Sequence, residues 1–163
     1  LRGELERYAS PDGEFVFSYP REFKRAPKLL KTHQNELFLR STQLKKYNVG
    51  ITIDPVTIKT LKDFGTVHQV AENIIKLERE KEGVMNAELK EVSRGILDGN
   101  ESYFIDYTAD STRGNIRYFS KLVVDSKQRL YVLTIQAKQD DFSKVKAEME
   151  AVIESFHTQS PTV

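Results

Sequence analysis

The sequence contains no cysteine, and this absence removes several kinds of chemistry. Thiolate catalysis, zinc sites with Cys ligands, iron–sulfur clusters and internal disulfides all need that side chain. The absence of cysteine does not identify the cellular compartment, because proteins without cysteine occur in both oxidising and reducing spaces. A chain of 163 residues is long enough to fold without a disulfide or a metal, since it buries about two-thirds of its unfolded surface.

An excess of charge of either sign is also missing. The chain has 25 Lys and Arg residues and 24 Asp and Glu residues, which gives a net charge of +1. Strong nucleic-acid binding proteins usually carry a basic excess that displaces counterions from phosphates. We interpret two short basic segments, at 24–31 and 45–46, as solvated loops. We therefore expect no nucleic-acid partner.

Long apolar runs and targeting features are absent as well. No segment approaches the roughly 20 apolar residues of a membrane-spanning helix. The protein is therefore expected to be at most peripheral to a membrane. The chain starts at Leu1 and shows no signal-peptide pattern. We interpret it as a processed or shortened protein whose targeting segment is missing from this chain.

Alternating apolar residues predict three strands in the first third of the sequence. The first, Phe15 to Tyr19, has an aromatic face, follows a Ser10–Gly13 turn and is stopped by Pro20. A shorter candidate spans 36–40. The clearest alternation covers 47–53, where every second residue is apolar.

A second group of strands forms a predicted antiparallel meander. The segments 88–97 and 101–108 flank Asp98–Gly99, a dipeptide typical of tight hairpins. A third strand covers 115–124, and the turn 125–128 leads into a fourth. That fourth strand has one apolar face, formed by Tyr131, Leu133, Ile135 and Ala137.

An amphipathic helix is predicted between the two groups of strands. Thr66 and Gln69 have the spacing of a capping box, in which each side chain accepts from backbone N–H groups at the helix start. Gly83 is placed as the residue just beyond the helix end. The apolar stripe has helical spacing and consists of Val67, Val70, Ala71, Ile74 and Ile75.

A second amphipathic helix is predicted near the end of the chain. Its apolar residues recur at steps of three and four between Phe142 and Phe156. Asp140 or Asp141 can cap it, and 158–163 is expected to be a frayed tail. Together these patterns predict an α+β fold in which helices pack on a mainly antiparallel sheet.

The three histidines are the only candidate metal ligands besides the carboxylates. His33, His68 and His157 do not have the spacing that places two imidazoles on one helical face. We interpret them as surface residues. Weak binding of zinc, manganese or calcium, helped by Asp63 or Glu72, stays open as an alternative. No structural metal and no cofactor are expected.

Catalytic sequence signatures are missing from the chain. There is no GxSxG motif, no Walker loop and no GxGxxG motif. We therefore expect a protein that works by binding other proteins and is not an enzyme. The alternative is a small-ligand carrier or an enzyme with a cleft between helix and sheet, because the fold alone does not settle function. A pocket of several hundred Å³ with converging polar groups would favour that alternative.

The residues of the segment Asp110–Gly114 are more distinctive than a plain connection between two strands requires. One interpretation is a turn that is held by the side chains of Asp110 and Ser111. The other is a recognition tip in which Arg113 offers its planar set of donors to a carboxylate of a partner. In a variant of the first interpretation, Arg113 braces the loop through Asp110.

Several segments in this order resemble the PsbP family, the extrinsic lumenal proteins of photosystem II and their relatives. The resemblance covers about residues 8–156. Its segments are Tyr8–Pro20, Tyr47–Pro55, Thr60–Gly65, Asp98–Gly99, Tyr103–Tyr107, Asp110–Gly114, Arg129–Tyr131 and Ser155–Phe156.

The resemblance implies an α/β/α sandwich around an antiparallel sheet, as one domain over 1–163. It also implies residence in the thylakoid lumen and a non-enzymatic role in binding photosystem II or another thylakoid membrane complex, as an extrinsic subunit or an assembly factor. The chain departs from the family in having no Trp; Phe23 and Phe142 stand where members often carry it. Only Leu1–Arg7 precede the core. A PsbP-like protein is therefore favoured over PsbP itself, whose extension retains calcium and chloride.

Overall fold

The protein consists of ten strands, two α-helices and two short 3-10 helices within the residues that the computed structural model describes, 4–26 and 35–158. The elements, in chain order, are β1 (Leu5–Ala9), β2 (Phe15–Pro20), β3 (Phe23–Arg25), β4 (Asn35–Ser41), β5 (Asn48–Pro55), η1 (Leu61–Asp63), α1 (Val67–Arg79), β6 (Val84–Leu97), β7 (Asn100–Ser111), β8 (Gly114–Val124), β9 (Arg129–Lys138), η2 (Gln139–Asp141), α2 (Phe142–Glu154) and β10 (His157–Thr158).

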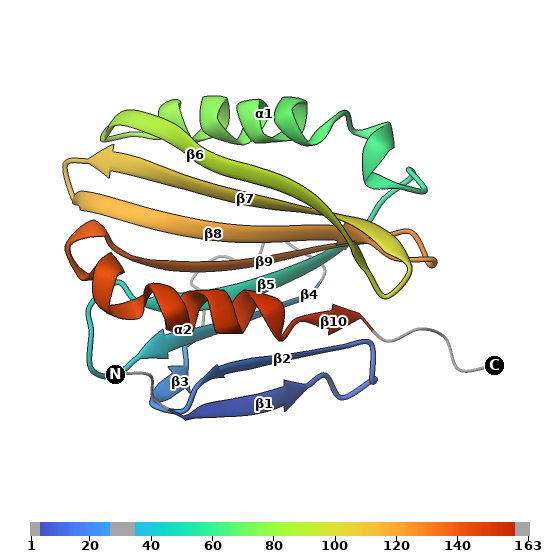
Figure 1. Cartoon of the computed structure of the whole chain (residues 1–163), viewed down its shortest axis with the longest axis horizontal. Coiled ribbons are helices and arrows are strands. Elements are labelled where there is room, and N and C mark those ends of the chain that lie inside the picture. Colours follow the sequence, from blue (N-terminus) through green and yellow to red (C-terminus); the bar gives the residue numbers. More distant parts are fainter. Residues whose placement is uncertain (1–3, 27–34, 159–163) are drawn as a thin grey trace.

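Two sheets make up the β structure (Figure 1). The larger sheet has the order β3-β4-β5-β9-β8-β7-β6, and all its neighbouring strands are antiparallel. The smaller sheet has the order β1-β2-β10. The strand that begins at Phe15 therefore belongs to a separate sheet. The alternation of apolar residues in the sequence did not indicate this.

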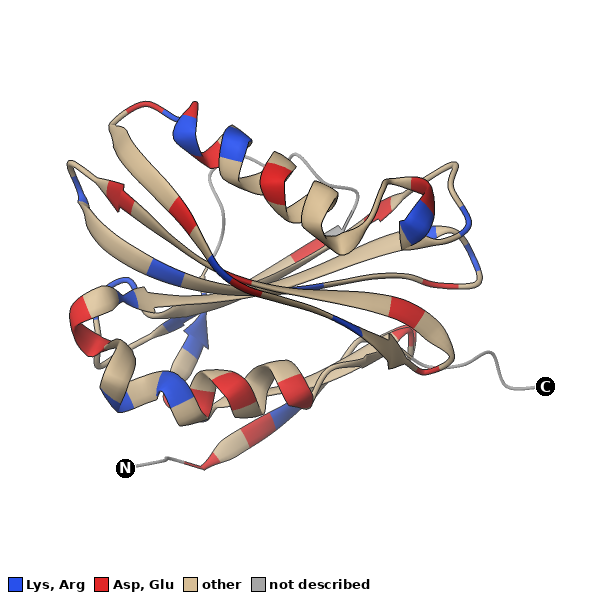
Figure 2. Ribbon diagram, turned by 45° about the horizontal axis from the view of Figure 1, so that its top comes forward, with Lys and Arg blue, Asp and Glu red and all other residues tan. Residues whose placement is uncertain are grey.

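The two helices lie on opposite sides of the large sheet (Figure 2). Helix α1 packs on β6 and β7, and α2 packs on β8 and β9 and also contacts β2. Each helix has its own apolar core: α1 covers one built on β7 and β8, and α2 covers one that also includes the aromatic residues of β2. This arrangement confirms the predicted α+β class and the α/β/α sandwich.

The predicted faces of the strands are those that become buried. Tyr131, Leu133, Ile135 and Ala137 of β9 are all fully buried against α2. The turn between β6 and β7 has the expected form, because Asp98 and Gly99 have φ values of 49° and 87°. Both values lie in the left-handed region that a two-residue hairpin of this type needs.

The start of α1 is as predicted, whereas its end is not. The backbone N–H of Gln69 donates to the Thr66 hydroxyl, and the backbone N–H of Thr66 donates to the Gln69 side chain, which confirms the capping box. The helix ends at Arg79 with Glu80 as its C-cap. Gly83 lies three residues beyond that cap and has a φ of 83° in the turn into β6, so its assignment to the helix end was wrong.

The end of the chain also differs from the prediction. Helix α2 stops at Glu154, and Asp141 occupies its N-cap position without a side-chain cap hydrogen bond. Thr158 is buried in β10 and pairs with Phe15, so it is not part of a frayed tail. Its backbone N–H donates to Asp98 over 2.8 Å, a contact that joins residues 60 positions apart. The rest of the predicted tail, 159–163, lies outside the described residues.

Neither helix of the described chain is long and apolar enough to cross a membrane. Both helices carry charged residues of both signs along their length (Figure 2).

Candidate partner-binding site

The segment predicted as a recognition tip forms a tight hairpin between β7 and β8. Ser111 pairs with Gly114, which leaves Thr112 and Arg113 as the two turn residues. The Ser111 hydroxyl accepts from the backbone N–H of Arg113 and donates to the carbonyl of Gly114. The φ of Gly114 is 120°, a value that favours glycine. The Ser111 side chain therefore holds the turn, as one interpretation predicted, whereas none of the described hydrogen bonds involves the side chain of Asp110.

The side chain of Arg113 is exposed and braced by the turn between α1 and β6. Its Nη2 donates to the carbonyl of Glu82 over 3.3 Å, and the backbone N–H of Thr112 donates to the carbonyl of Gly83 over 2.9 Å. Asp110 does not take part in this bracing. It alternates with Ala109, which is buried beneath α1, so its side chain lies on the opposite face of the sheet.

A third segment, the turn between β4 and β5, meets the same tip. Lys46 has a φ of 61°, and its Nζ donates to the carbonyl of Arg113. The side-chain amide of Gln136 donates to the carbonyl of Lys46 over 3.2 Å. The tip is thus held by two turns that are remote in sequence. Such prior ordering lowers the entropy that a binding surface loses when it meets a partner.

The three turns enclose a small depression, here called the tip cleft, with a volume of about 310 Å³. Lys46, Lys81 and Arg113 line it, and Glu78 is its only lining carboxylate in the described part of the chain. Glu78 is buried and pairs with Lys81 over 2.8 Å. Sequence reasoning found Arg113 but placed Lys46 in a solvated loop, because nothing local indicates that three distant turns converge.

A larger depression, the helix–sheet groove, continues from the tip cleft between α1 and the large sheet. Its volume is about 690 Å³, and it shares Glu78, Lys81 and Gln136 with the tip cleft. Ile74 and Leu77 of α1 form one wall. The floor is built from β4, β5, β7, β8 and β9, with both apolar and hydroxyl side chains.

Two stacked tyrosines connect the two depressions. Tyr107 lines the groove and Tyr118 lines the tip cleft, and their ring centroids are 4.7 Å apart with the planes inclined by 11°. Burial raises the pKa of Tyr118 to about 12, with a further rise from Glu78 and a fall from Arg113. Burial also raises the pKa of Tyr107. Both phenols therefore stay protonated at neutral pH and can act as donors.

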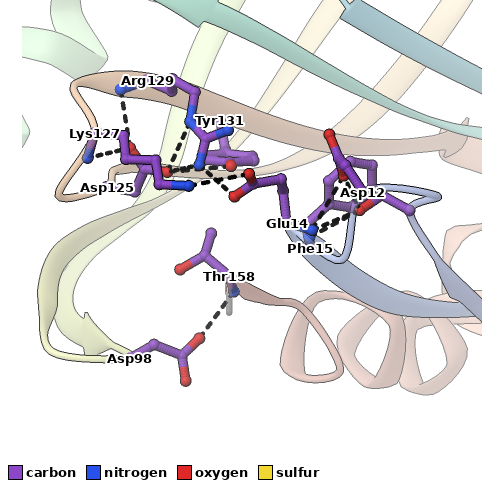
Figure 3. Close-up of polar contacts among 10 residues, drawn as sticks. Asp12, Glu14, Phe15, Asp98, Asp125, Lys127, Arg129, Tyr131 and Thr158 are labelled. Carbon is purple, nitrogen blue, oxygen red and sulfur yellow. Dashed lines mark hydrogen bonds and ion pairs between the residues drawn. The ribbon is translucent and has the colours of Figure 1, made fainter. Parts of the chain in front are cut away.

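A second charged cluster lies where the small sheet meets the large one (Figure 3). Arg129 donates to Asp125 over 2.6 Å and to Glu14 over 2.5 Å. Lys127 adds an ion pair to Glu14 at 3.2 Å, and the hydroxyl of Tyr131 donates to Asp125 over 3.2 Å. Sequence reasoning missed this cluster, although Asp125 and Arg129 flank a predicted turn.

This second cluster is a structural connection with its charges paired. The hydrogen bond from Arg129, opposed by burial and helped by Lys127, lowers the pKa of Glu14. The hydrogen bonds that Arg129 donates to Glu14 and Asp125 keep the pKa of Arg129 above its already high ordinary value. Glu14 precedes β2 and Arg129 begins β9, so the cluster fastens the small sheet to the large one.

The histidines do not assemble into a site. His68 and Glu72 are both exposed on α1, and His157 Nδ1 lies 3.3 Å from Asp98. Asp63 accepts from the backbone N–H groups of Lys59 and Thr60, so its carboxylate caps a 3-10 helix. His33 lies outside the described residues. No group of three or more His, Asp or Glu residues suited to a metal occurs within residues 4–26 and 35–158.

A family model, a curated relative and a solved structure that match this chain all carry the name PsbP. The family model described as PsbP matches residues 3–158. The chain is 30% identical over 157 residues to "PsbP domain-containing protein 2, chloroplastic" of Arabidopsis thaliana; the match covers 94% of this chain and 66% of that relative.

Solved structures share the fold at lower identity. The solution structure of cyanobacterial PsbP from Synechocystis sp. PCC 6803 has a TM-score of 0.80 and 20% identity, with 96% of this chain and 94% of that chain covered. The Ran-binding protein Mog1p of Saccharomyces cerevisiae has a TM-score of 0.62 and 9% identity, with 96% of each chain covered.

Proposed function

Since the chain belongs to the PsbP family, we propose that it is a non-enzymatic protein of the thylakoid lumen that binds photosystem II or another photosynthetic membrane complex. In this proposal it acts at the membrane surface, as an extrinsic subunit or as an assembly or stability factor. Family membership is the observation that carries the proposal, and the chloroplast relative supports the location.

The hairpin tip at 110–114 is the proposed contact with the partner. Arg113 is exposed. Lys46 donates to its carbonyl, and the backbone N–H of the preceding residue, Thr112, donates to the carbonyl of Gly83. Only one of the five guanidinium donors is used in the described contacts, by the carbonyl of Glu82. The remaining donors suit a carboxylate on the partner. Asp110, on the other face of β7, would contact the partner along the side of the hairpin.

Affinity purification from thylakoids tests this function directly. The tagged protein should recover subunits of a membrane complex, and Arg113→Ala should weaken the association by roughly 1–3 kcal/mol, the range for a charge-assisted bond. Lys144→Ala is the matched control, because Lys144 is a cation with a 71% exposed side chain on α2. The melting temperature of Arg113→Ala should stay close to that of the wild type, since exposed substitutions change stability by about 0.5 kcal/mol or less.

Two results would count against the proposal. If the wild-type protein is recovered without any subunit of a membrane complex, the proposed binding to such a complex is refuted. An Arg113→Ala protein that melts several degrees lower, but binds normally once folded, shows that Arg113 only braces the hairpin.

A further inference from the structure

The helix–sheet groove has a size and a lining that suit a small amphipathic molecule. Its volume of about 690 Å³ falls within the roughly 300–1,000 Å³ that ligand sites usually have. The apolar lining includes Leu77, a residue that is 53% exposed and so leaves apolar surface in contact with water. Leu122 and Val132 provide apolar surface on the facing strands. An aliphatic chain laid between them would remove this surface from water.

The tip cleft at one end of the groove is positively charged. Lys81 and Glu78 neutralise each other at 2.8 Å, which leaves the charges of Lys46 and Arg113. Their described side-chain hydrogen bonds go to the backbone carbonyls of Arg113 and Glu82, which carry no formal charge. Both cations keep donors that can meet a further acceptor.

We propose that the groove and the tip cleft together bind an anionic amphiphile with a single aliphatic chain. The chain lies between α1 and the sheet, and the anionic group lies in the tip cleft against Lys46 and Arg113. Tyr118 lines the same cleft, and its phenol can act as a neutral donor. A fatty carboxylate and an acyl chain of an anionic lipid share this chemistry.

The charge arrangement favours an anionic head group over a neutral or cationic one. A cation would meet Lys46, Lys81 and Arg113 in one small cleft, with Glu78 already paired. A neutral head group would leave the two remaining positive charges without compensation. Two hydroxyls of the floor compete less for the anion, because Ser120 and Thr134 are hydrogen-bonded to each other over 2.8 Å.

Binding of laurate, measured by calorimetry below its micellar concentration, is the direct test. Laurate should bind with a one-to-one stoichiometry, and both acetate and dodecanol should bind far more weakly, because each lacks one half of the ligand. Lys46→Gln and Arg113→Gln should each weaken laurate binding about tenfold, the factor that corresponds to one charge-assisted bond. Lys144→Gln, on the other side of the sheet, should leave it unchanged.

The apolar half of the site is tested by Leu77→Glu. This variant places a carboxylate on the groove wall and should abolish laurate binding. Ile96→Glu, at a residue that is 74% exposed and outside the groove, is the control and should bind as the wild type does. Equal melting temperatures of the two variants show that Leu77→Glu has kept the fold.

Vesicles distinguish the two sources of ligand. Binding of monomeric laurate alone indicates a soluble fatty anion. Binding to phosphatidylcholine vesicles only when they contain phosphatidylglycerol, with loss in Leu77→Glu, indicates a membrane lipid. The proposal is overturned if neither probe binds, if acetate binds as well as laurate, or if the glutamine variants bind normally.

Arg113 contributes to this site and to the proposed partner contact, and Leu77→Glu separates the two. It should lose the amphiphile and still recover the membrane complex. If the wild-type protein binds laurate but recovers no complex, the proposed function fails and the ligand site stands.

Discussion

Replacing Arg129 with Met tests how strongly the charged cluster fastens the small sheet to the large one. In the wild type the guanidinium donates to Glu14 over 2.5 Å and to Asp125 over 2.6 Å. The three side chains are 9–23% exposed. Without Arg129, two poorly hydrated carboxylates face each other, and Lys127 is the remaining cation of the cluster.

The size of the effect follows from this partial burial. Breaking a fully buried ion pair costs about 3–5 kcal/mol, whereas an exposed pair contributes about 0–1 kcal/mol. We expect Arg129→Met to lower the free energy of unfolding by about 2–3 kcal/mol. For a domain of this length, each kcal/mol shifts the melting temperature by about 2–4 °C. The variant should therefore melt roughly 5–10 °C below the wild type.

The pH dependence gives this prediction a specific signature. Arg129 lowers the pKa of Glu14 in the folded state, so the pair stabilises the fold above the ordinary Glu pKa of about 4.3. That contribution disappears as the pH falls through the lowered pKa. The difference in the free energy of unfolding between wild type and Arg129→Met should have its full size at pH 7 and should shrink below about pH 4.

Urea unfolding at pH 7 and at pH 3–4 measures both quantities. Arg21→Met is the control, because the Arg21–Glu4 pair has side chains that are 68% and 77% exposed. It should change the stability by less than about 1 kcal/mol. A loss for Arg129→Met that equals this control, or that stays constant down to pH 3, would refute the reasoning.

Three further predictions concern single local contacts. Thr66→Ala removes the hydroxyl that accepts from Gln69 and should lower the unfolding free energy by about 1 kcal/mol in urea. Gly99→Ala meets no atom within 4 Å, so its effect should come only from a φ of 87° and amount to about 1–2 kcal/mol in urea. Burial and the hydrogen bond to Glu148 raise the pKa of Tyr47. In an ultraviolet titration, wild type and Tyr47→Phe should therefore ionise the same number of tyrosines as long as the protein is folded. The wild type should show one more only at the pH where it unfolds, well above the ordinary Tyr pKa of about 10.

The sequence by itself determined the local features of this protein. Asp98–Gly99 dictated a tight hairpin because few other residues adopt two successive positive φ values. Thr66 and Gln69 fixed the start of α1 through bonds within one turn of chain. Strict alternation in β9 identified its buried face, since successive side chains of a strand point to opposite sides.

Only the tertiary structure decided which of these pieces meet. Alternation shows which face of a strand is apolar but not which strand pairs with it, so the separate small sheet was not foreseen. Arg129 and Glu14 are 115 positions apart, and Lys46 and Arg113 are 67 apart. Contacts at such separations depend on the path of the whole chain, because the side chains involved are individually ordinary surface charges. For the same reason the tip cleft and the groove beside it have no local signature in the sequence.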